Sequence, residues 1–359
     1  MSEINFDGLI GPTHNYSGLS EGNNASKKNF SSPSNPKNAA LQGIKKAETL
    51  IASGLKQGFF LPHERPFIPG LKKLGFNGTD EEILSSAFDH SKVLLSNFSS
   101  ASSMWAANAA TVSPSPDTQD DKVHITPANL NTMFHRSIET EFTYKQCKII
   151  FPKNYFEIHN PAPTISGYGD EGAANHLRIS KSHNEKGFEI FVYGESGFKN
   201  DKTSVKRQAL EVSRSIAFNH KLDMENTFFL QQNHQAVKEG SFHNDIVSLS
   251  NERVFIAHEN AFQNKDDLNK MLNILKSKID NFQYIEISES EIPLKDIISS
   301  YLLNSQLITN GDNEMQLILP EEVKGYENCM SWLDKLKQIS DVKLFDFVDI
   351  RQSMMNGGG

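Results

Sequence analysis

The sequence predicts an α/β fold in which small sheets surround a centre pseudo-symmetrically, instead of forming one continuous sheet. One observation is a β-β-α-β order of apolar runs, in which two strands joined at Asn251-Glu252 precede a helix and a third strand. The other is that this order returns farther along the chain, as expected for a repeated unit. The two units consist of residues 245–250, 253–258, 265–279 and 283–287, and of residues 306–308, 315–319, 321–339 and 342–347.

Composition limits the class of protein and its partners. The chain has 359 residues, of which 37% are hydrophobic and 22% charged, so it can bury a sizeable core as a soluble globular protein. A net charge of -8 without a strong basic patch argues against a nucleic-acid partner. We recognise no export signal and no membrane-spanning apolar run, and expect no membrane partner. Two cysteines form neither a disulfide framework nor a zinc motif, so we expect a cytoplasmic protein.

The N-terminal region is expected to place a long loop before a helix. Residues 4–10 alternate as a half-buried strand does, and residues 11–35 are rich in Gly, Asn and Ser, as loops are. Within this loop, Ser17 to Ser26 is either a ligand flap or part of a disordered insertion. A helix then begins at Asn35-Pro36 and ends before Gly54. Its predicted apolar stripe contains Leu41, Ile44, Ala47 and Ile51.

Three positions in the middle of the chain carry polar groups of interest. Asn108 lies in residues 104–110, which resemble a buried helix, so its amide needs a partner, either backbone or a substrate carboxylate. His135-Arg136 ends a short helix and either meets an anion or stays solvated. Arg207 lies off the apolar stripe of a helix expected over 203–220. Further strands are expected at residues 59–61, 123–125, 148–151, 189–193 and 228–230, and a capping box at Thr79 to Glu82.

The candidate site centres on Asp170 and Glu171, in the run Gly169 to His176. Glycines on both sides of the two carboxylates allow positive φ and a close approach to a ligand. Residues 167–172 also match the G-x-G-x-x-G dinucleotide pattern. We reject that interpretation, because no hydrophobic strand precedes the pattern and the carboxylates would repel a pyrophosphate.

Two further groups are expected to serve the same site. His243 and Asp245 are two residues apart and would share one face of a strand, and Asn356 to Gly359 is too rich in glycine for an ordinary ordered terminus. Carboxylates suit a cation, which could be a metal held by Glu171, His243 and Asp245, or a guanidinium or ammonium substrate. No H-E-x-x-H or EF-hand spacing supports a metal. Cleavage of a guanidinium favours a thiolate nucleophile, so a suitable cysteine is expected.

Six short motifs spread over the whole chain share one resemblance. They are Asn5 to Leu9, Gly18 to Ser26, Pro62 to Pro69, Gly169 to His176, Phe242 to Asp245, and Met355 to Gly359. Together they resemble the bacterial N-succinylarginine dihydrolases, a family of guanidino-group-modifying enzymes. The resemblance implies a single catalytic domain over 1–359, folded as a pentein-type, five-fold pseudo-symmetric α/β propeller of ββαβ units. It also implies conversion of N2-succinylarginine and two waters to N2-succinylornithine, two ammonia and carbon dioxide, without a cofactor or metal.

The resemblance implies roles for the residues at matching positions. Glu171 would be the catalytic carboxylate, and His243 the general acid and base. Substrate contacts would come from Ser17, Gly18, Leu19, Ser20, Glu21, Gly22, Asn23, Asn24, Ala25, Ser26, Asn108, His135, Arg136, Arg207, Asp245 and Asn356. Glu171 and Asp245 suit the guanidinium, whereas the two arginines suit the succinyl and α-carboxylates.

One feature departs from the family pattern. In the family, Asn-Gly-Gly-Gly is followed by Pro-Ala-Cys, whose cysteine is the nucleophile, whereas this sequence ends at Gly359. We therefore expect the nucleophile just beyond Gly359, an incomplete last propeller unit, and no hydrolase activity from the chain as written. Cys147 and Cys329 match no family motif and are expected to be structural.

Two other functions stay open at this point. One is a non-catalytic binder of arginine derivatives, and the other is an arginine deiminase or amidinotransferase. All three functions imply a small-molecule partner. A homodimer is an open alternative to a monomer.

Overall fold

The strands of the protein form five separate sheets around a common centre. The computed structural model describes residues 3–15, 18–20, 24–30, 32–198 and 207–355. In four sheets the first two strands are antiparallel and the third is parallel to the second. These sheets are β3 (Ala110–Ser113), β4 (Val123–Pro127) and β5 (Phe156–Ile158); β6 (His176–Ile179), β7 (Phe188–Tyr193) and β8 (Thr227–Gln231); β9 (Ser248–Asn251), β10 (Val254–His258) and β11 (Gln283–Ile287); and β12 (Gln306–Thr309), β13 (Met315–Pro320) and β14 (Val342–Val348). The fifth sheet pairs β1 (Ile4–Gly8) with β2 (Lys56–Phe60) in parallel.

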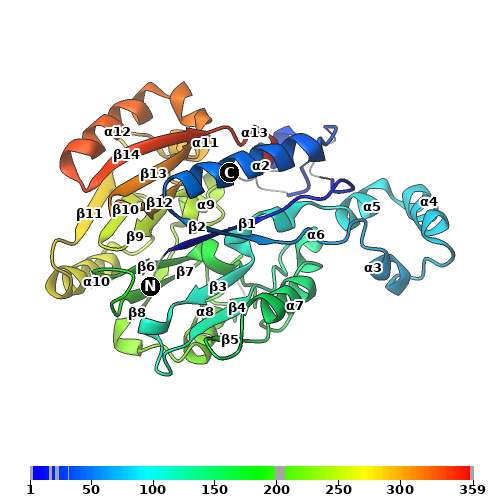
Figure 1. Cartoon of the computed structure of the whole chain (residues 1–359), viewed down its shortest axis with the longest axis horizontal. Helices are drawn as coiled ribbons and strands as arrows, with labels where there is room; N and C mark the ends of the chain where they lie inside the picture. Colours follow the sequence, from blue (N-terminus) through cyan, green and yellow to red (C-terminus); the bar gives the residue numbers. More distant parts are fainter. Residues whose placement is uncertain (1–2, 16–17, 21–23, 31, 199–206, 356–359) are drawn as a thin grey trace.

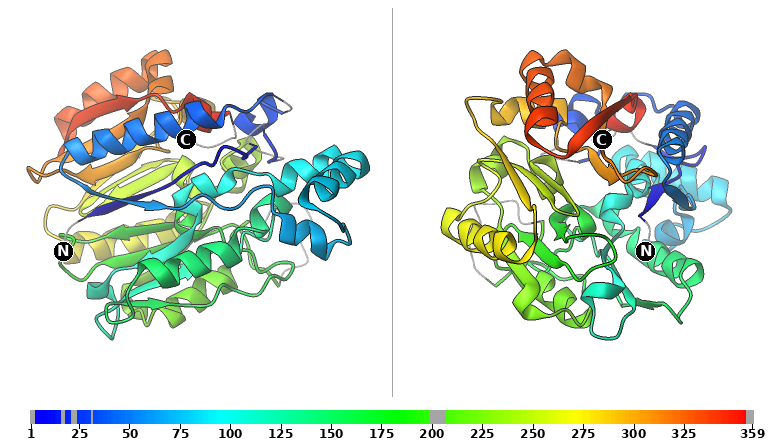
Figure 2. Two further views of the ribbon diagram at one scale, coloured as in Figure 1. Left: turned by 45° about the vertical axis from the view of Figure 1, so that its right-hand side comes forward. Right: turned by 60° about the vertical axis from the view of Figure 1, so that its left-hand side comes forward.

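Each parallel pair of strands is connected by a helix that lies outside the sheets (Figures 1 and 2). These helices are α2 (Pro36–Ala52), α7 (Thr140–Ile150), α8 (Leu210–Asn219), α10 (Lys265–Lys278) and α12 (Glu327–Ile339). The unit β1-α2-β2 therefore repeats the last three elements of the β-β-α-β units. This arrangement confirms the predicted α/β fold of small sheets around a centre.

Shorter helices complete the fold. They are α1 (Asn24–Lys28), α3 (Ile68–Lys73), α4 (Asp80–His90), α5 (Lys92–Phe98), α6 (Phe134–Ser137), α9 (His234–Glu239), α11 (Leu294–Ser300) and α13 (Arg351–Met354). Helices α3, α4 and α5 project to one side of the molecule (Figure 1). The predicted capping box starts α4, because Thr79 Oγ1 accepts a hydrogen bond from the Glu82 N–H and Glu82 Oε2 accepts one from the Thr79 N–H.

The largest core joins the three sheets from β6 to β14. Helix α10 shows how the sequence builds it. Asn264 caps the helix by accepting hydrogen bonds from the N–H groups of Asp266 and Asp267, whose negative charges also suit the first turn. The side of the helix that enters the core carries Leu268, Met271, Leu272 and Leu275, all buried. This is the stripe that a period of 3.6 residues produces.

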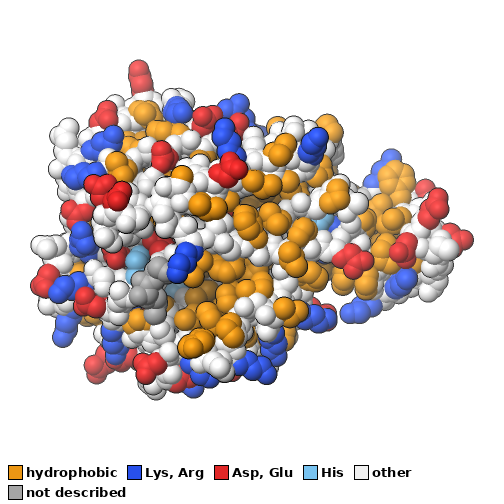
Figure 3. Space-filling view, viewed as in Figure 1, with side chains coloured by type: hydrophobic (Ala, Val, Ile, Leu, Met, Phe, Trp, Pro, Cys, Tyr) orange, Lys and Arg blue, Asp and Glu red, His pale blue; other side chains and the backbone are white. Residues whose placement is uncertain are grey.

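The predicted apolar stripe of α2 is wrong at three of its four positions. Leu41, Ile44 and Ile51 are 55%, 44% and 53% exposed, and hydrophobic side chains are visible where α2 crosses the face in Figure 3. The helix packs through Ala47, the predicted position that is buried, and through Ala39 and Leu50. Small alanines let the helix approach the sheet closely, so the buried side is rotated away from the largest apolar residues.

Three other local predictions are corrected. Residues 148–151 are not a strand; all but Phe151 belong to helix α7, in which Cys147 is buried and Ile149 is 84% exposed. Residues 104–110 form short 3₁₀ turns instead of a buried helix. In the described part of 203–220 the helix begins only at Leu210, so Arg207 lies before it. In each case tertiary packing, and not the local sequence pattern alone, fixed the element type or its start.

A cluster of three imidazoles links the β3-β4-β5 sheet to the end of α8. The rings of His124, His159 and His220 form a triangle, in which the His159 ring centre lies 5.0 Å from His124 and 5.2 Å from His220, and the other two centres are 5.6 Å apart. His124 is hydrogen-bonded to His159 at 2.8 Å and to Asp120 at 2.8 Å. Burial lowers the pKa of His220 well below its ordinary value, and the neighbouring imidazoles lower it further. Protonation of His220 is therefore unfavourable in the folded protein.

Acidification is expected to destabilise the fold through this cluster. The unfolded chain binds a proton at His220 near pH 6.5, whereas the folded chain does not, so stability is complete above pH 6.5 and falls as the pH decreases. Between pH 6.5 and 5, His220 alone contributes a loss of about 2 kcal/mol. Urea unfolding at both pH values measures it. His220→Gln should remove this loss, whereas His90→Gln, on the exposed end of α4, should not. An equal change of unfolding free energy with pH in the wild type and both variants would contradict the expectation.

Candidate active site

Backbone contacts on both sides hold the loop that carries Asp170 and Glu171. Gly172 has a φ of +69°, and its N–H donates to Asp170 Oδ1 at 3.2 Å. A Cβ atom on Gly169 would lie 2.3 Å from the Arg207 carbonyl oxygen. Positive φ at one glycine and close backbone approach at the other are conditions that only glycine meets without strain. The structure thus explains both glycines that the sequence singled out.

The segment after β4 fastens this loop from another side. The Asp170 N–H donates to Asn129 Oδ1 at 2.9 Å, and the Leu130 N–H donates to the Asp170 carbonyl oxygen at 3.0 Å. Leu130 has a φ of +49°, an unfavourable conformation for leucine. Gln208 Oε1 also accepts the Glu171 N–H at 2.7 Å. Two distant parts of the chain, residues 129–130 and 207–208, therefore fix the backbone of Asp170 and Glu171.

The Glu171 carboxylate is fully buried and its two oxygens receive three donors. Glu171 Oε2 accepts from Arg136 Nη1 at 2.6 Å and lies 2.8 Å from His243 Nε2, and Oε1 accepts from Thr132 Oγ1 at 2.9 Å. Burial acts to raise the pKa of Glu171, but Arg136, His243 and Arg207 outweigh it and hold the pKa well below its ordinary value. Glu171 is therefore ionised and already paired on both oxygens.

His243 and Asp245 come together in a way the sequence did not predict. They lie at the start of a 3₁₀ turn (Asn244–Ile246), not on one face of a strand, since β9 begins only at Ser248. Burial lowers the pKa of His243 to about 4, and Arg207 and Arg136 contribute to the lowering, although Glu171 opposes it. The imidazole is thus neutral at pH 7, and it can accept a proton that the Glu171 charge then stabilises.

Asp245 is a carboxylate of the cavity wall with a free oxygen. Its Oδ1 is buried and, within the part of the chain that the structure describes, has no hydrogen-bond partner. Burial raises the pKa of Asp245 to about 7, and Glu171 contributes in the same direction. A cationic ligand at this oxygen would lower the pKa again.

Two buried arginines complete the site. Arg136 and Arg207 are 2% and 3% exposed, and among the described residues Nε and Nη2 of each have no hydrogen-bond partner. Arg136 is paired with Glu171 through Nη1, whereas Arg207 lies over the Phe242 ring at 4.2 Å. Unsatisfied guanidinium N–H groups in a protein interior are costly, so they indicate where an anionic ligand would bind.

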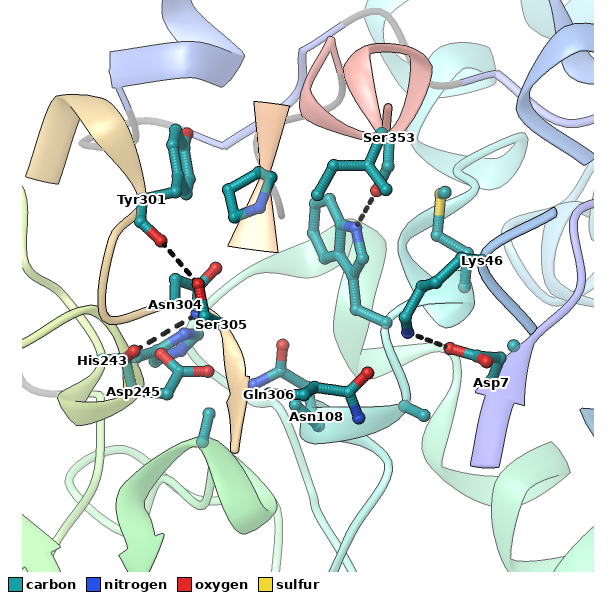
Figure 4. A pocket seen from close by; sticks show the side chains of 18 of the residues that line it. Asp7, Lys46, Asn108, His243, Asp245, Tyr301, Asn304, Ser305, Gln306 and Ser353 are labelled. Atoms are coloured by element: carbon teal, nitrogen blue, oxygen red, sulfur yellow. Dashed lines mark hydrogen bonds and ion pairs between the residues drawn. The ribbon is translucent and has the colours of Figure 1, made fainter. Parts of the chain in front are cut away.

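These groups surround a cavity of about 310 Å³. The predicted site residues that line it are Ser20, Asn108, Arg136, Arg207, His243 and Asp245. Figure 4 shows His243 and Asp245 on the same side of the cavity, with Lys46 paired to Asp7 at the opposite end. Glu171 does not line the cavity and lies behind His243, to which it is bonded. Glu171 and His243, far apart in sequence, are thus brought together, and the third predicted group, residues 356–359, lies outside the described residues.

The other predicted substrate contacts occupy different places. The Asn108 amide donates to the Glu171 carbonyl oxygen at 3.0 Å, so its partner is backbone. His135 Nε2 lies 3.3 Å from Ser20 Oγ, and the Ser20 N–H donates to Ser26 Oγ at 2.9 Å. Gly18 has positive φ and Leu19 is half-buried. Asn24 and Ala25 belong to α1. Ser17, Glu21, Gly22, Asn23 and Asn356 lie outside the described residues.

Sequence reasoning missed several residues that hold the site. Thr132 and Gln208 bind Glu171, and Phe242 contacts both Arg207 and His243. Gln208 directly follows the predicted site residue Arg207, which is a weak signal, whereas no local pattern marks Thr132. Among the described residues, no group of three or more His, Cys, Asp or Glu side chains could hold a metal ion. None of the described helices is both long and apolar enough to cross a membrane.

Comparison with known proteins identifies the family. The family model described as succinylarginine dihydrolase matches residues 1–359. The chain belongs to the succinylarginine dihydrolase family. The N-succinylarginine dihydrolase of Acinetobacter baumannii is 44% identical over 99% of this chain and 81% of its own length. That of Hahella chejuensis is 46% identical with the same coverage. Family members are hydrolases that act on a guanidino C–N bond.

Solved structures of low sequence identity share the fold. The dimethylarginine dimethylaminohydrolase (DDAH) of Pseudomonas aeruginosa, complexed with citrulline, aligns with a TM-score of 0.53 at 15% identity, covering 100% of this chain and 96% of that one. SxtG, an amidinotransferase from Microseira wollei, also has a TM-score of 0.53, at 12% identity, covering 100% of this chain and 92% of that one. The family member described here therefore has the pentein-type α/β propeller fold that its sequence predicted.

Proposed function

We propose that this site binds N2-succinylarginine and supplies the carboxylate and histidine for its hydrolysis to N2-succinylornithine, two ammonia and carbon dioxide. The observation that carries the proposal is the pairing of a neutral His243 with an ionised Glu171 beside an unpartnered Asp245 oxygen. This set of groups suits a guanidinium and the proton transfers needed to break its C–N bonds. The named activity of the relatives supports the choice of substrate.

The geometry divides the two carboxylates between two tasks. Because Glu171 already accepts three donors, it orients His243 and stabilises the imidazolium, and Asp245 is the acceptor for the guanidinium. The free N–H groups of Arg207 and Arg136 suit the substrate carboxylates. Asn356 and the Ser17 to Ser26 segment remain predicted substrate contacts, and the homodimer remains a prediction.

The reaction needs a thiolate that neither cysteine of this sequence can supply. Cys147 is buried beside β4, and burial raises its thiol pKa to about 12; burial also raises the pKa of Cys329, which lies in the main core. Neither lines the cavity. We therefore propose that the nucleophile is the Pro-Ala-Cys cysteine of the family, outside these 359 residues, and that the 359-residue chain binds N2-succinylarginine without turnover.

His243 then moves the protons of each step. It takes the thiol proton and gives it to the departing ammonia as the sulfur attacks the guanidinium carbon. It next takes a proton from the water that attacks the thiouronium, and returns it to the thiolate as the C–S bond breaks. A second cycle on the resulting urea group releases the second ammonia and leaves a carbamate, which loses carbon dioxide.

Calorimetry on the 359-residue chain tests the binding half of the proposal. N2-succinylarginine should bind, whereas N2-succinylornithine, which has no guanidinium, should bind at least ten-fold more weakly. Equal affinity for both compounds, or no binding of either by the folded chain, would refute the assignment.

Asp245→Asn should weaken the binding of N2-succinylarginine about 10- to 100-fold, as expected for loss of a charged hydrogen-bond acceptor. Because the pKa of free Asp245 is about 7 and a bound cation lowers it, wild-type affinity should rise as the pH increases through 7. The variant should lack this rise. Asp280→Asn, at a carboxylate that is 84% exposed, is the matched control and should bind as the wild type does. An Asp245 variant with wild-type affinity would assign the guanidinium to another acceptor.

A further inference from the structure

Arg207 lies against an aromatic ring and forms no ion pair with an acidic side chain of the described residues, although the Glu171 charge acts on it. Its guanidinium carbon lies 4.2 Å from the centre of the Phe242 ring, within the range of a cation–π interaction. The side chain is 3% exposed, and no described residue accepts a hydrogen bond from Nε or Nη2. Burial lowers the pKa of Arg207 to about 10, so the group remains a cation at neutral pH. Within the described part of the chain, this buried cation of the cavity wall therefore has N–H groups left over for an anionic ligand.

Phe242 has a second contact in the same cavity wall. Its ring meets the His243 imidazole edge-on, with centroids 4.7 Å apart and an interplanar angle of 69°. The ring also packs against the main hydrophobic core, which limits its movement. One side chain thus connects the catalytic imidazole and the free arginine to a rigid part of the fold. The adjacent residues in sequence, Phe242 and His243, therefore set the spacing between two ends of a bound substrate.

We propose that Phe242 is a positioning residue that holds the Arg207 guanidinium against its ring, so that Arg207 binds a substrate carboxylate through its free N–H groups. The choice of substrate rests on the proposed function. A guanidinium is planar and pairs with a carboxylate through two parallel N–H groups, whereas a lysine ammonium in its place would be a point charge without this geometry. A flat ring is a suitable support for such a group, because it attracts the cation without occupying its N–H groups.

Calorimetry with three ligands tests this role in the 359-residue chain. N2-succinylarginine carries carboxylates and a guanidinium, succinate carries only carboxylates, and agmatine carries a guanidinium but no carboxylate. Phe242→Leu should weaken the binding of N2-succinylarginine and of succinate about ten-fold, the range of a partly desolvated cation–π contact. Its affinity for agmatine should stay within about two-fold of the wild type. Phe242→Tyr, which keeps the ring, should restore wild-type affinity for all three. Thermal unfolding confirms that each variant is folded.

A double-mutant cycle separates action through Arg207 from a general packing effect. If Phe242 acts through Arg207, the Phe242→Leu/Arg207→Lys double variant should bind N2-succinylarginine no more weakly than Arg207→Lys alone. Additive losses, or an equal loss for agmatine, would overturn the role of Phe242 and leave the proposed function intact. A chain that binds succinate but does not bind N2-succinylarginine would refute the proposed function and leave the role of Phe242 intact. A wild-type chain that binds no carboxylate ligand would overturn both.

Discussion

Replacing His243 by asparagine is expected to lower turnover of N2-succinylarginine by about 10²- to 10⁴-fold, the range for loss of a positioned acid–base group. The protein for this assay is the extended chain, which is this sequence continued past Gly359 by the matching C-terminal segment of the Acinetobacter baumannii relative. Asparagine can still bond to Glu171, but it cannot carry a proton between thiol, ammonia and water. Ammonia release under saturating substrate measures the effect on kcat.

Two observations accompany this prediction. His234→Asn, at a half-buried histidine on α9, is the control and should hydrolyse N2-succinylarginine with the kcat of the wild type. Because the pKa of free Asp245 is about 7 and that of free His243 is about 4, kcat/KM of the wild type should fall once as the pH decreases through 7 and again near pH 4, where the free imidazole becomes protonated. A His243→Asn variant within ten-fold of wild-type kcat would show that another group transfers the protons.

Replacing Glu171 by glutamine is expected to cost about 3–5 kcal/mol of unfolding free energy, the range for breaking a buried ion pair from one side. Glu171 is fully buried and its charge compensates Arg136, which is 2% exposed. Glutamine keeps the shape of the side chain but leaves the arginine charge without its partner. Urea unfolding of the 359-residue chain at pH 7 measures the difference.

The control for this variant is an ion pair at the surface. Glu141 pairs with Lys145 on α7, and the two side chains are 67% and 64% exposed, so Glu141→Gln should change stability by less than about 1 kcal/mol. The low pKa of Glu171 also predicts that the difference between wild type and Glu171→Gln shrinks as the pH falls below about 4, where the unfolded wild-type carboxylate binds a proton. Equal stabilities of the Glu171 and Glu141 variants at pH 7 would contradict the pairing seen in the structure.

The fold was predictable because its units repeat and its strands are short and apolar. The order β9-β10-α10-β11 followed by β12-β13-α12-β14 is visible in the sequence, and Asn264 and Thr79 mark helix starts through local hydrogen bonds. The rotation of α2 was not predictable, because its buried side carries Ala39 and Leu50 while the larger apolar stripe around Leu41 is exposed, a choice that periodicity does not report.

The site was predictable to the level of residues but not of partners. Glycines around Glu171 and the spacing of His243 and Asp245 indicated a cation site, and these residues do converge. What the sequence could not show is that Arg136 neutralises Glu171, which leaves Asp245 as the free carboxylate. It also gave no sign of Thr132, because a threonine that donates to a buried carboxylate across 39 positions of sequence has no local pattern.

The central claim is that these groups hydrolyse both terminal C–N bonds of a succinylated arginine, and the number of ammonia molecules released per substrate tests it most directly. The extended chain should release two ammonia and one carbon dioxide for each N2-succinylarginine consumed, and leave N2-succinylornithine. One ammonia with a ureido product would identify a deiminase, and transfer of the amidino group without ammonia would identify an amidinotransferase; either result would contradict the account.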